Sequence, residues 1–343
     1  MFRRFVFALA IPLALAVASP PVFSQTVYVS NICGDNANSG TLDEPLETIA
    51  GAFALPEIPQ QICVLPSGLM PYERTTIPMG LEPESGGVLE IVAVGGPSET
   101  ISEGFVVSQD TAVKIVGFTI SFSGDGVVLE GDSADGGIHE VTLTNLVIVD
   151  CTLNGIYIGY ESTQDFFRVN NCTIWGNGEA GIEIDIFDGF SVDPFASGTI
   201  QDCIIGENGN SGVYARGCQN GTGLVTLRHN CFYGNLPGPI NCSNDQLFEI
   251  DRVTLLEAPC FVAPSLGVFT MDPLCDGPAL RDRGSITRLD PDGSRNDLGA
   301  YGGPDATTFF ECETVGPQIT AIFVDSCEDP DEITIHVFGR AGQ

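Results

Sequence analysis

The middle of the chain alternates between apolar and polar residues with a period of two. In Val169–Ile186 an apolar run ends at Trp175, an Asn/Gly-rich stretch follows, and Ile182, Ile184 and Ile186 then alternate with acidic residues. Such alternation puts the isoleucines on one face of a strand and the carboxylates on the other. The stretch therefore predicts two short strands joined by a tight corner.

This unit recurs along the chain. Its first strand follows an Asn or Asp at intervals of 26, 31 and 28 residues: Asn145, Asn171, Asp202 and Asn230. Its second strand follows a glycine each time: Gly126, Gly155, Gly181 and Gly212. A constant order of elements at a period under 35 residues indicates a solenoid, whose units stack on one another.

The repeat predicts which side chains stack. We expect an inward column along one axis made of Ile148, Ile174, Ile205 and Tyr233. We also expect a buried asparagine ladder at one corner, with Asn145, Asn171 and Asn230 joining neighbouring coils through their amides.

The repeat resembles that of right-handed parallel β-helix proteins of the pectate-lyase-like superfamily, whose units read approximately n-N-x-I-x-x-N-x-x-x-G-I-x-L. Two further segments resemble parts of secreted β-helix proteins. Residues 28–52 match an N-terminal YV, GD, GT, P, TI, A pattern, and residues 290–303 (DPDGSRNDLGAYGG) match a tract that ends many such domains. The resemblance implies three short strands per coil, in a superfamily of polysaccharide lyases and proteins without known activity.

The fold class expected is all-β. We predict a single-stranded right-handed parallel β-helix over residues 26–304, with regular coils from about Ala112 to Asn235 and irregular final coils over residues 236–290. Leu46, Ile49 and Phe53 lie at helical spacing, and this short helix should cap the first coil. Residues 305–343 form a C-terminal β extension, either a hairpin or the start of a truncated second domain.

The N-terminus indicates export. Arg3 and Arg4 precede an apolar run from Phe5 to Ala18, and small residues follow, which is typical of a secretory signal peptide over residues 1–24. No later segment is apolar enough to span a membrane. We expect a secreted or cell-surface protein.

The charge balance excludes one class of partner. The chain carries 45 acidic and 13 basic residues, for a net charge of −32. Such a surface repels polyanions, so nucleic acid is excluded as a partner. A polysaccharide or a cell-surface glycan remains the expected ligand. The oligomeric state does not follow from the sequence.

Twelve cysteines in an exported chain predict some disulfide bonds. Cys172, Cys203 and Cys231 occupy one repeat position and should form a buried, reduced ladder. Proximity in sequence suggests the pairs Cys33–Cys63, Cys218–Cys242, Cys260–Cys275 and Cys312–Cys327.

The tract after residue 289 is a candidate calcium site. Its oxygen-bearing side chains alternate on a tight turn: Asp290, Asp292, Ser294, Asn296 and Asp297. Calcium takes six to eight such oxygens. The tract departs from an EF-hand loop, because Arg295 replaces the glycine and Tyr301 stands where the bidentate Glu belongs. The alternative is a turn held by side-chain hydrogen bonds to the backbone.

A second candidate is an outward ligand face on the central coils: Glu183, Asp185, Asp188 and Arg216, with Glu130 one pleat step out of line. Pectate lyases bind calcium with such carboxylates and abstract a proton with a Lys or Arg. Lys114 has no acidic cluster near it in sequence, while Arg168, Arg216 and Arg228 lie closer to the middle of the stack. Aromatic residues such as Tyr157, Trp175, Tyr214 and Tyr233 could stack on sugars or pack against the coils.

Two functions follow. The first is a non-catalytic secreted or surface protein that binds polysaccharide or serves adhesion. The second, implied by the resemblance, is a calcium-assisted polysaccharide lyase or another carbohydrate-active enzyme. The sequence favours the first, because the signature residues of glycoside hydrolases of this fold do not occur in it.

Overall fold

The computed structural model describes residues 26–68, 70–83, 86–108, 110–130, 140–159, 166–185, 195–217, 222–242, 247–254, 258–272, 280–306, 319–324 and 335–339. The predicted signal peptide and Asp188 lie outside these ranges.

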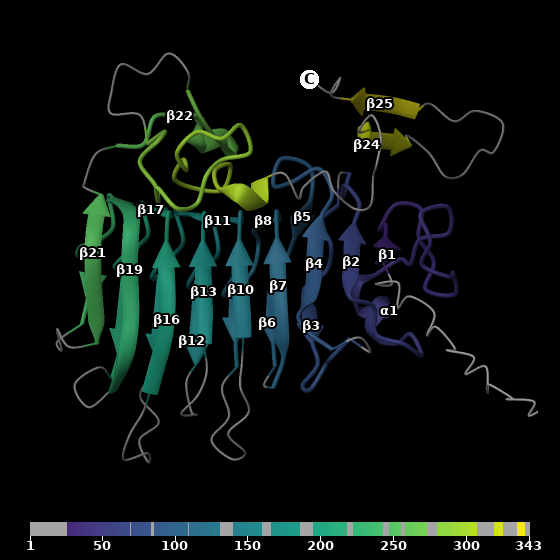
Figure 1. Cartoon of the computed structure of the whole chain (residues 1–343), viewed down its shortest axis with the longest axis horizontal. Helices are drawn as coiled ribbons and strands as arrows, with labels where there is room; N and C mark the ends of the chain where they lie inside the picture. Colours follow the sequence, from purple (N-terminus) through teal and green to yellow (C-terminus); the bar gives the residue numbers. More distant parts are fainter. Residues whose placement is uncertain are drawn as a thin grey trace, which may run out of the picture.

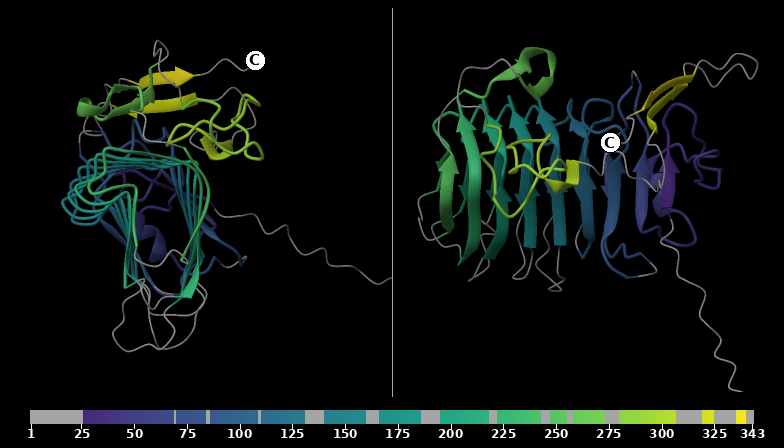
Figure 2. Two further views of the ribbon diagram at one scale, coloured as in Figure 1. Left: turned by 90° about the vertical axis from the view of Figure 1, so that its left-hand side faces the viewer. Right: turned by 45° about the horizontal axis from the view of Figure 1, so that its top comes forward.

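The chain winds into a parallel β-helix with three faces (Figures 1 and 2). The first face contains β1 (Thr26–Val29), β2 (Gln61–Val64), β4 (Leu89–Ala93), β7 (Ala112–Val116), β10 (Glu140–Thr144), β13 (Phe166–Asn170), β16 (Phe195–Gln201), the first part of β19 (Thr222–Tyr233) and β21 (Phe248–Thr254). The second contains β5 (Ile101–Ser102), β8 (Thr119–Ile120), β11 (Val147–Val149), β14 (Thr173–Trp175), β17 (Ile204–Gly206) and the end of β19. The third contains β3 (Thr75–Ile77), β6 (Phe105–Val107), β9 (Val127–Leu129), β12 (Ile156–Gly159), β15 (Ile182–Asp185), β18 (Val213–Arg216) and β20 (Ile240–Asn241). The predicted fold class is confirmed.

Strand register reproduces most of the predicted columns. On the second face Ile148 pairs with Ile174 and Ile174 with Ile205, and all three are buried. Ile205 then pairs with Phe232, whereas Tyr233 pairs with Gly206 and points outward. Tyr233 was therefore wrongly predicted as the fourth member of the column. On the third face Val127, Ile156, Ile182 and Val213 form the inward column that the glycine-led repeat predicts.

The corner between the first and second faces also lies one residue earlier than predicted in the coil that contains Asn230. Left-handed backbone conformations mark this corner at Asn145, Asn171, Asp202 and His229, with φ values between 47° and 57°. Asn and Asp tolerate this conformation better than most residues. Asn230 therefore belongs one residue further on, where its side chain accepts from Cys203 N and donates to Ile200 O. The predicted corner ladder was therefore wrong. The side-chain amides of Asn145 and Asn171 donate to residues 296–302, whereas that of Asn230 donates to the preceding coil.

An asparagine ladder forms instead at the corner between the second and third faces. The Nδ2 of Asn177 donates to Asn208 Oδ1 at 2.9 Å, and the Nδ2 of Asn208 donates to Asn235 Oδ1 at 2.8 Å. Each oxygen also accepts the backbone N–H of the preceding ladder residue, at 3.1 and 3.2 Å. The ladder satisfies buried polar groups at a corner, where no strand pairing does so.

The predicted N-terminal helix is short. α1 (Ile49–Phe53) begins after Thr48, whose hydroxyl accepts from Gly51 N at 3.0 Å, which is an N-cap arrangement. Ile49 and Ala52 are buried, and the helix contacts β1, β2 and β3 at one end of the stack (Figure 1). Within the described chain no helix has the length and apolar character that a membrane span requires.

The parallel stack ends at β21, so the prediction of irregular coils throughout residues 236–290 holds only in part. The antiparallel pair of β22 (Phe261–Ala263) and β23 (Val268–Met271), with the 3-10 helix Pro264–Leu266 between, packs on the outside of the second face. It forms a second apolar core there, outside the coils. The members of that core include Val147, Ile204, Cys231, Phe261, Phe269 and Leu298.

Residues 280–306, which we call the return segment, then run back along the corner between the first and second faces. The backbone N–H of Ser285 donates to Asp202 Oδ1, and the Nδ2 of Asn145 donates to Ala300 O. The Nζ of Lys114 reaches Asp305 Oδ1 at 3.0 Å. The segment thus ties together successive coils from β16 back to β7. Beyond it, β24 (Ile319–Val324) and β25 (Ile335–Gly339) pair in an antiparallel arrangement, and both alternatives for residues 305–343 stay predictions.

The structure confirms some of the cysteine predictions and contradicts others. Cys172 and Cys203 are buried thiols in neighbouring coils, as expected. Cys231 instead pairs with Ile204 and points into the outer core, so its place in the ladder was wrong. Cys242 carries a thiol, which contradicts the predicted Cys218–Cys242 bond. Cys33, Cys63 and Cys260 are disulfide-bonded, and their predicted partners stay predictions.

Candidate functional site

The outer surface of the third face carries two columns of side chains. The first, which we call the aromatic column, contains Thr76, Val106, Val128, Tyr157, Glu183, Tyr214 and Asn241 in successive coils. The second, the charged column, lies two residues further along the strands. It contains Gly159, Asp185 and Arg216 in register, and Glu130 lies in line with Gly159 because Leu129 pairs with Ile158.

The Tyr157 ring lies along its own strand over Gly159. A Cβ atom on Gly159 would come within 3.2 Å of the ring carbon Cε1 of Tyr157. The phenol O–H donates to Asp185 Oδ2 in the next coil at 3.2 Å. Burial, followed by the nearby Asp185, raises the pKa of Tyr157 to about 12, so the phenol stays protonated and keeps this donor. The missing side chain at position 159 thus lets an aromatic ring lie flat on the sheet.

Two carboxylates on β15 have different partners. Asp185, with a side chain 13% exposed, accepts from Tyr157 and also from Nη1 of Arg216 at 3.4 Å. Glu183 accepts from Nδ2 of Asn154 at 2.9 Å. Burial raises the pKa of Glu183, and the hydrogen bond from Asn154 opposes that rise. The strand therefore presents one carboxylate held by two donors and one that burial pushes towards its neutral form.

The predicted ligand face is brought together in part. Glu183, Asp185 and Arg216 share the centre of the third face. Asp188 lies outside the described residues. Glu130 aligns with Asp185 and not with Glu183, and its Oε2 accepts from Ser108.

The other basic candidates lie elsewhere. Lys114 on β7 pairs with Asp305 and Glu90, and Arg168 on β13 pairs with Glu140 and covers the Phe166 ring at 4.3 Å. Both belong to the first face, as does the exposed Arg228. Among the described residues, Arg216 is the arginine that contacts a carboxylate of the third face.

The oxygen atoms of the candidate calcium tract serve as turn acceptors. Asp290 accepts from the backbone N–H groups of Asp297 and Gly303, and Asp292 accepts from Ser294 N and Oγ at 2.9 and 2.6 Å. Burial raises the pKa of Asp290, whereas the Ser294 hydrogen bonds lower that of Asp292.

The last two members of that tract are also hydrogen-bonded. Asp297 accepts from Asp282 N at 2.7 Å. Asn296 is fully buried and bonds to Asp202 and Asn171. Within the described ranges no group of three or more His, Cys, Asp or Glu side chains is placed to hold a metal ion. The calcium site stays a prediction, and these bonds fit the alternative of a hydrogen-bonded turn.

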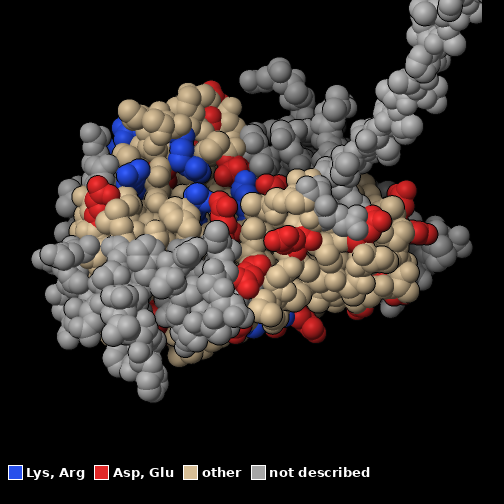
Figure 3. Space-filling model, turned by 60° about the horizontal axis from the view of Figure 1, so that its bottom comes forward, with Lys and Arg blue, Asp and Glu red and all other residues tan. Residues whose placement is uncertain are grey.

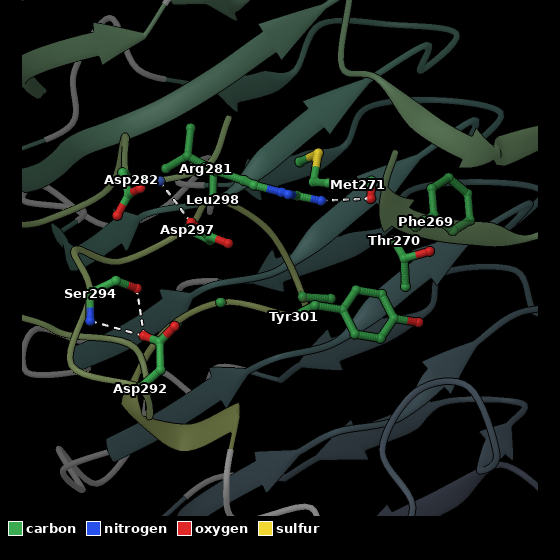
Figure 4. A pocket seen from close by; sticks show the side chains of 12 residues that line it. Phe269, Thr270, Met271, Arg281, Asp282, Asp292, Ser294, Asp297, Leu298 and Tyr301 are labelled. Atoms are coloured by element: carbon green, nitrogen blue, oxygen red, sulfur yellow. Dashed lines mark hydrogen bonds between the residues drawn. The ribbon is translucent and has the colours of Figure 1, made fainter. Parts of the chain in front are cut away.

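A pocket of about 450 Å³ lies between β23 and the return segment (Figure 4). Phe269, Met271 and Tyr301 line one part of it, and Asp292 and Asp297 another. Arg281 spans the pocket in the close-up and donates from Nη2 to Met271 O at 3.1 Å. Three members of the predicted calcium set thus face a pocket that a cation or a small polar molecule could enter: Asp292, Ser294 and Asp297.

The outward aromatic residues of the second and third faces have different surroundings. Trp175 stacks on Tyr233 at 6.1 Å and meets Phe261 edge-on at 5.3 Å, so both outward aromatics of the second face pack in the outer core. Tyr157 and Tyr214 stay partly exposed on the third face. The prediction omitted Gly159 and Asn154 from the ligand face. A glycine two residues after Tyr157 on the same strand face was the available signal.

Sequence comparisons identify no relative of this chain. No protein-family model matches it, and no curated protein sequence matches it. Among solved structures, the pectate lyase Pel9A has a TM-score of 0.40 at 12% identity, covering 80% of this chain and 96% of that chain. A GH136 lacto-N-biosidase from Eubacterium ramulus has a TM-score of 0.37 at 15% identity, covering 61% of this chain and 52% of that chain. We therefore argue function from the side chains of the third face.

Proposed function

We propose that this is an exported polysaccharide-binding protein whose ligand lies on the outer side of the third face. The observation that carries the proposal is the Tyr157 ring, which lies over Gly159 and is tied to Asp185. Aromatic rings held flat offer sugar rings an apolar stacking surface. Carboxylates and a guanidinium next to such a ring supply acceptors and donors for hydroxyl groups.

The surroundings of Tyr157 support this role. The Asp185 side chain is 13% exposed and accepts from Tyr157 at 3.2 Å and from Arg216 at 3.4 Å, so this carboxylate and the Tyr157 phenol hold each other in place without ligand. A face whose hydrogen-bonding groups are already positioned loses little conformational entropy on binding. The signal peptide predicted at residues 1–24 supports placement outside the cell, where polysaccharides are found.

Affinity electrophoresis through gels containing soluble polysaccharides tests the proposal. We expect at least one polysaccharide to retard the protein, and Tyr157→Ala to reduce the retardation. Tyr28→Ala is the matched control, since Tyr28 is a partly exposed tyrosine on β1 of the first face. Equal retardation of the Tyr157→Ala protein and the wild type would place the ligand elsewhere.

Enzymatic cleavage of the bound polysaccharide is the second candidate. Glu183 and Asp185 alternate on one strand and point to the same side, about 6.8 Å apart at their Cα atoms. Hydrolysis of a glycosidic bond uses such a pair of carboxyl groups, one as acid and one as base or nucleophile. Burial raises the pKa of Glu183, as a general acid requires. In the lyase alternative, Arg216 would act as the base.

The two chemistries leave different products. Hydrolysis creates reducing ends without new ultraviolet absorbance, whereas a lyase creates an unsaturated product that absorbs in the ultraviolet. Glu183→Gln should abolish hydrolysis while binding persists. If neither product forms from a polysaccharide that the protein binds, the non-catalytic role holds.

A further inference from the structure

In the described part of the chain, the third face is a sheet of seven strands that follow one another along the axis of the β-helix. Successive strands lie about 4.8 Å apart. Tyr157 and Tyr214 are two coils apart, so their Cα atoms are separated by about 9.6 Å. This spacing is close to the length of a disaccharide unit in an extended chain of pyranose rings. Glu183 lies between the two tyrosines in the same column.

The remainder of the aromatic column is also suited to an extended chain. Val106 and Val128 continue the column on the side of Tyr157, and both are partly exposed. Since the strands cross the axis, a ligand that follows this column must run along the β-helix and cross successive strands. Loops could not supply so regular a track, because only the stacked strands repeat at a constant spacing.

The charges beside this column decide the class of glycan. The described part of the charged column holds the carboxylates of Glu130 and Asp185, and Glu183 adds a third from the aromatic column. Against them stands Arg216, which is already paired with Asp185. Among the described residues of this face, Arg74 lies directly before β3, at the end of the sheet away from Arg216, and donates to Asp125 O at 2.7 Å. A uronate or sulfate group beside Tyr157 and Tyr214 would therefore meet mainly carboxylates.

The charge of the whole chain acts in the same direction. With a net charge of −32 the protein repels polyanions at a distance. On the side of the molecule in Figure 3 the basic side chains gather mainly in one area, while acidic side chains are spread over the rest. Sugar hydroxyls, by contrast, donate well to carboxylate oxygens.

We propose that the ligand is a neutral polysaccharide, lying along the β-helix axis with alternate rings stacked on Tyr157 and Tyr214. Hydroxyl groups of the intervening ring donate to Glu183. This assignment rests on the polysaccharide-binding function proposed above, and it identifies the class of ligand and its direction on the face.

Affinity electrophoresis in excess EDTA, with matched neutral and uronate-containing polysaccharides, tests the assignment. The neutral panel is a mixed-linkage β-glucan, an unsubstituted xylan and a galactomannan, and the acidic panel is polygalacturonate and alginate. We expect retardation by a neutral polysaccharide that changes little with added salt, because no charge is neutralised on binding. Tyr157→Ala and Tyr214→Ala should each weaken that binding by about tenfold, whereas Tyr214→Phe should retain it.

The outcomes separate the two proposals. Retardation by an acidic polysaccharide alone, lost in Tyr157→Ala, overturns the neutral-ligand assignment and leaves polysaccharide binding standing. Binding of a neutral polysaccharide that Tyr157→Ala weakens but Tyr214→Ala does not overturns the axial path. Absence of retardation in every gel, with a folded protein, overturns the proposed function itself. Circular dichroism of each variant before electrophoresis establishes that it is folded.

Discussion

The Nδ2 of Asn296 donates a hydrogen bond to Asp202 Oδ2 at 2.7 Å, although the two residues lie 94 positions apart in sequence. Both are fully buried, and Asn296 also exchanges hydrogen bonds with Asn171. Asp202 accepts from Ser285 N as well. Asn296 therefore ties the return segment to the corner between the first and second faces of the β-helix.

Removing the Asn296 amide should destabilise the fold. Asn296→Ala leaves the buried Oδ1 of Asn171 without its donor and removes one of the two side-chain donors to Asp202 Oδ2, the other being Gln201 Nε2. We expect a loss of about 2 kcal/mol in the free energy of unfolding. Urea unfolding followed by circular dichroism measures it. Asn241→Ala, at an exposed position on β20, is the control and should cost under about 0.5 kcal/mol. Equal midpoints for the two variants would mean that the return segment does not stabilise the coils.

The sequence predicted the coils well because their contacts repeat at a constant interval. The glycine-led column of the third face came out residue for residue. The predicted column of the second face was wrong by one residue at its fourth member, where Phe232 stands in place of Tyr233. Asn230 looks like the better corner residue by propensity, yet His229 takes the left-handed position with a φ of 49°.

The return segment could not be predicted in the same way. Its contacts with the coils join residues 83 to 191 positions apart, and no period relates them. The ligand face could be predicted only in part. Strand alternation predicted that Glu183 and Asp185 share a side, but the bond from Tyr157 to Asp185 depends on how the Tyr157 ring lies over Gly159.

The asparagine ladder predicts a second stability effect. Asn208 lies in the middle of the ladder, where Nδ2 and Oδ1 both connect coils. Asn208→Ala should lower the free energy of unfolding by about 2 kcal/mol, because the backbone N–H of Asn177 loses its acceptor and is left buried and unpaired. Asn208→Asp keeps the acceptor and loses the donor. A stability for Asn208→Asp no higher than that of Asn208→Ala would mean that the acceptor contributes nothing.

Glu183 should make stability depend on pH. Burial raises the pKa of its carboxyl in the folded state above the unfolded value of about 4.3. The stability that this group contributes is complete below that unfolded value and is lost as pH rises through the folded pKa. Glu183→Gln should therefore raise Tm at pH 7 and change it little near pH 3.5.

The matched control for this effect is Glu130→Gln, which removes one exposed carboxylate from the same face. Differential scanning calorimetry of both variants across that pH range separates the effect of burying a carboxylate from the effect of removing one negative charge. Equal gains in Tm for Glu130→Gln and Glu183→Gln at pH 7 would contradict the role of burial.

Adding calcium distinguishes the two interpretations of residues 290–297, which are a calcium site and a hydrogen-bonded turn. The carboxylates of Asp290, Asp292 and Asp297 already accept hydrogen bonds from N–H groups of the return segment. We therefore expect Tm to be the same in EDTA and in calcium. An increase of Tm in calcium that Asp292→Asn removes would restore the calcium site, since Asp292 is exposed and its loss alone should cost little.

Gly159 gives the sharpest test of the ligand face, because it changes the face without removing any group proposed to contact sugar. Its position lies under the Tyr157 ring, where a Cβ would be 3.2 Å from Cε1. Gly159→Val should tilt the ring off the sheet, break its hydrogen bond to Asp185, and weaken polysaccharide binding by about tenfold. Since position 159 faces outward on β12, Tm should fall by no more than a few degrees. Arg216→Ala provides the comparison: it removes one partner of Asp185 but leaves Tyr157 on the sheet, so its effect on binding should be smaller. Full binding by Gly159→Val would show that the flat ring is not what the polysaccharide contacts.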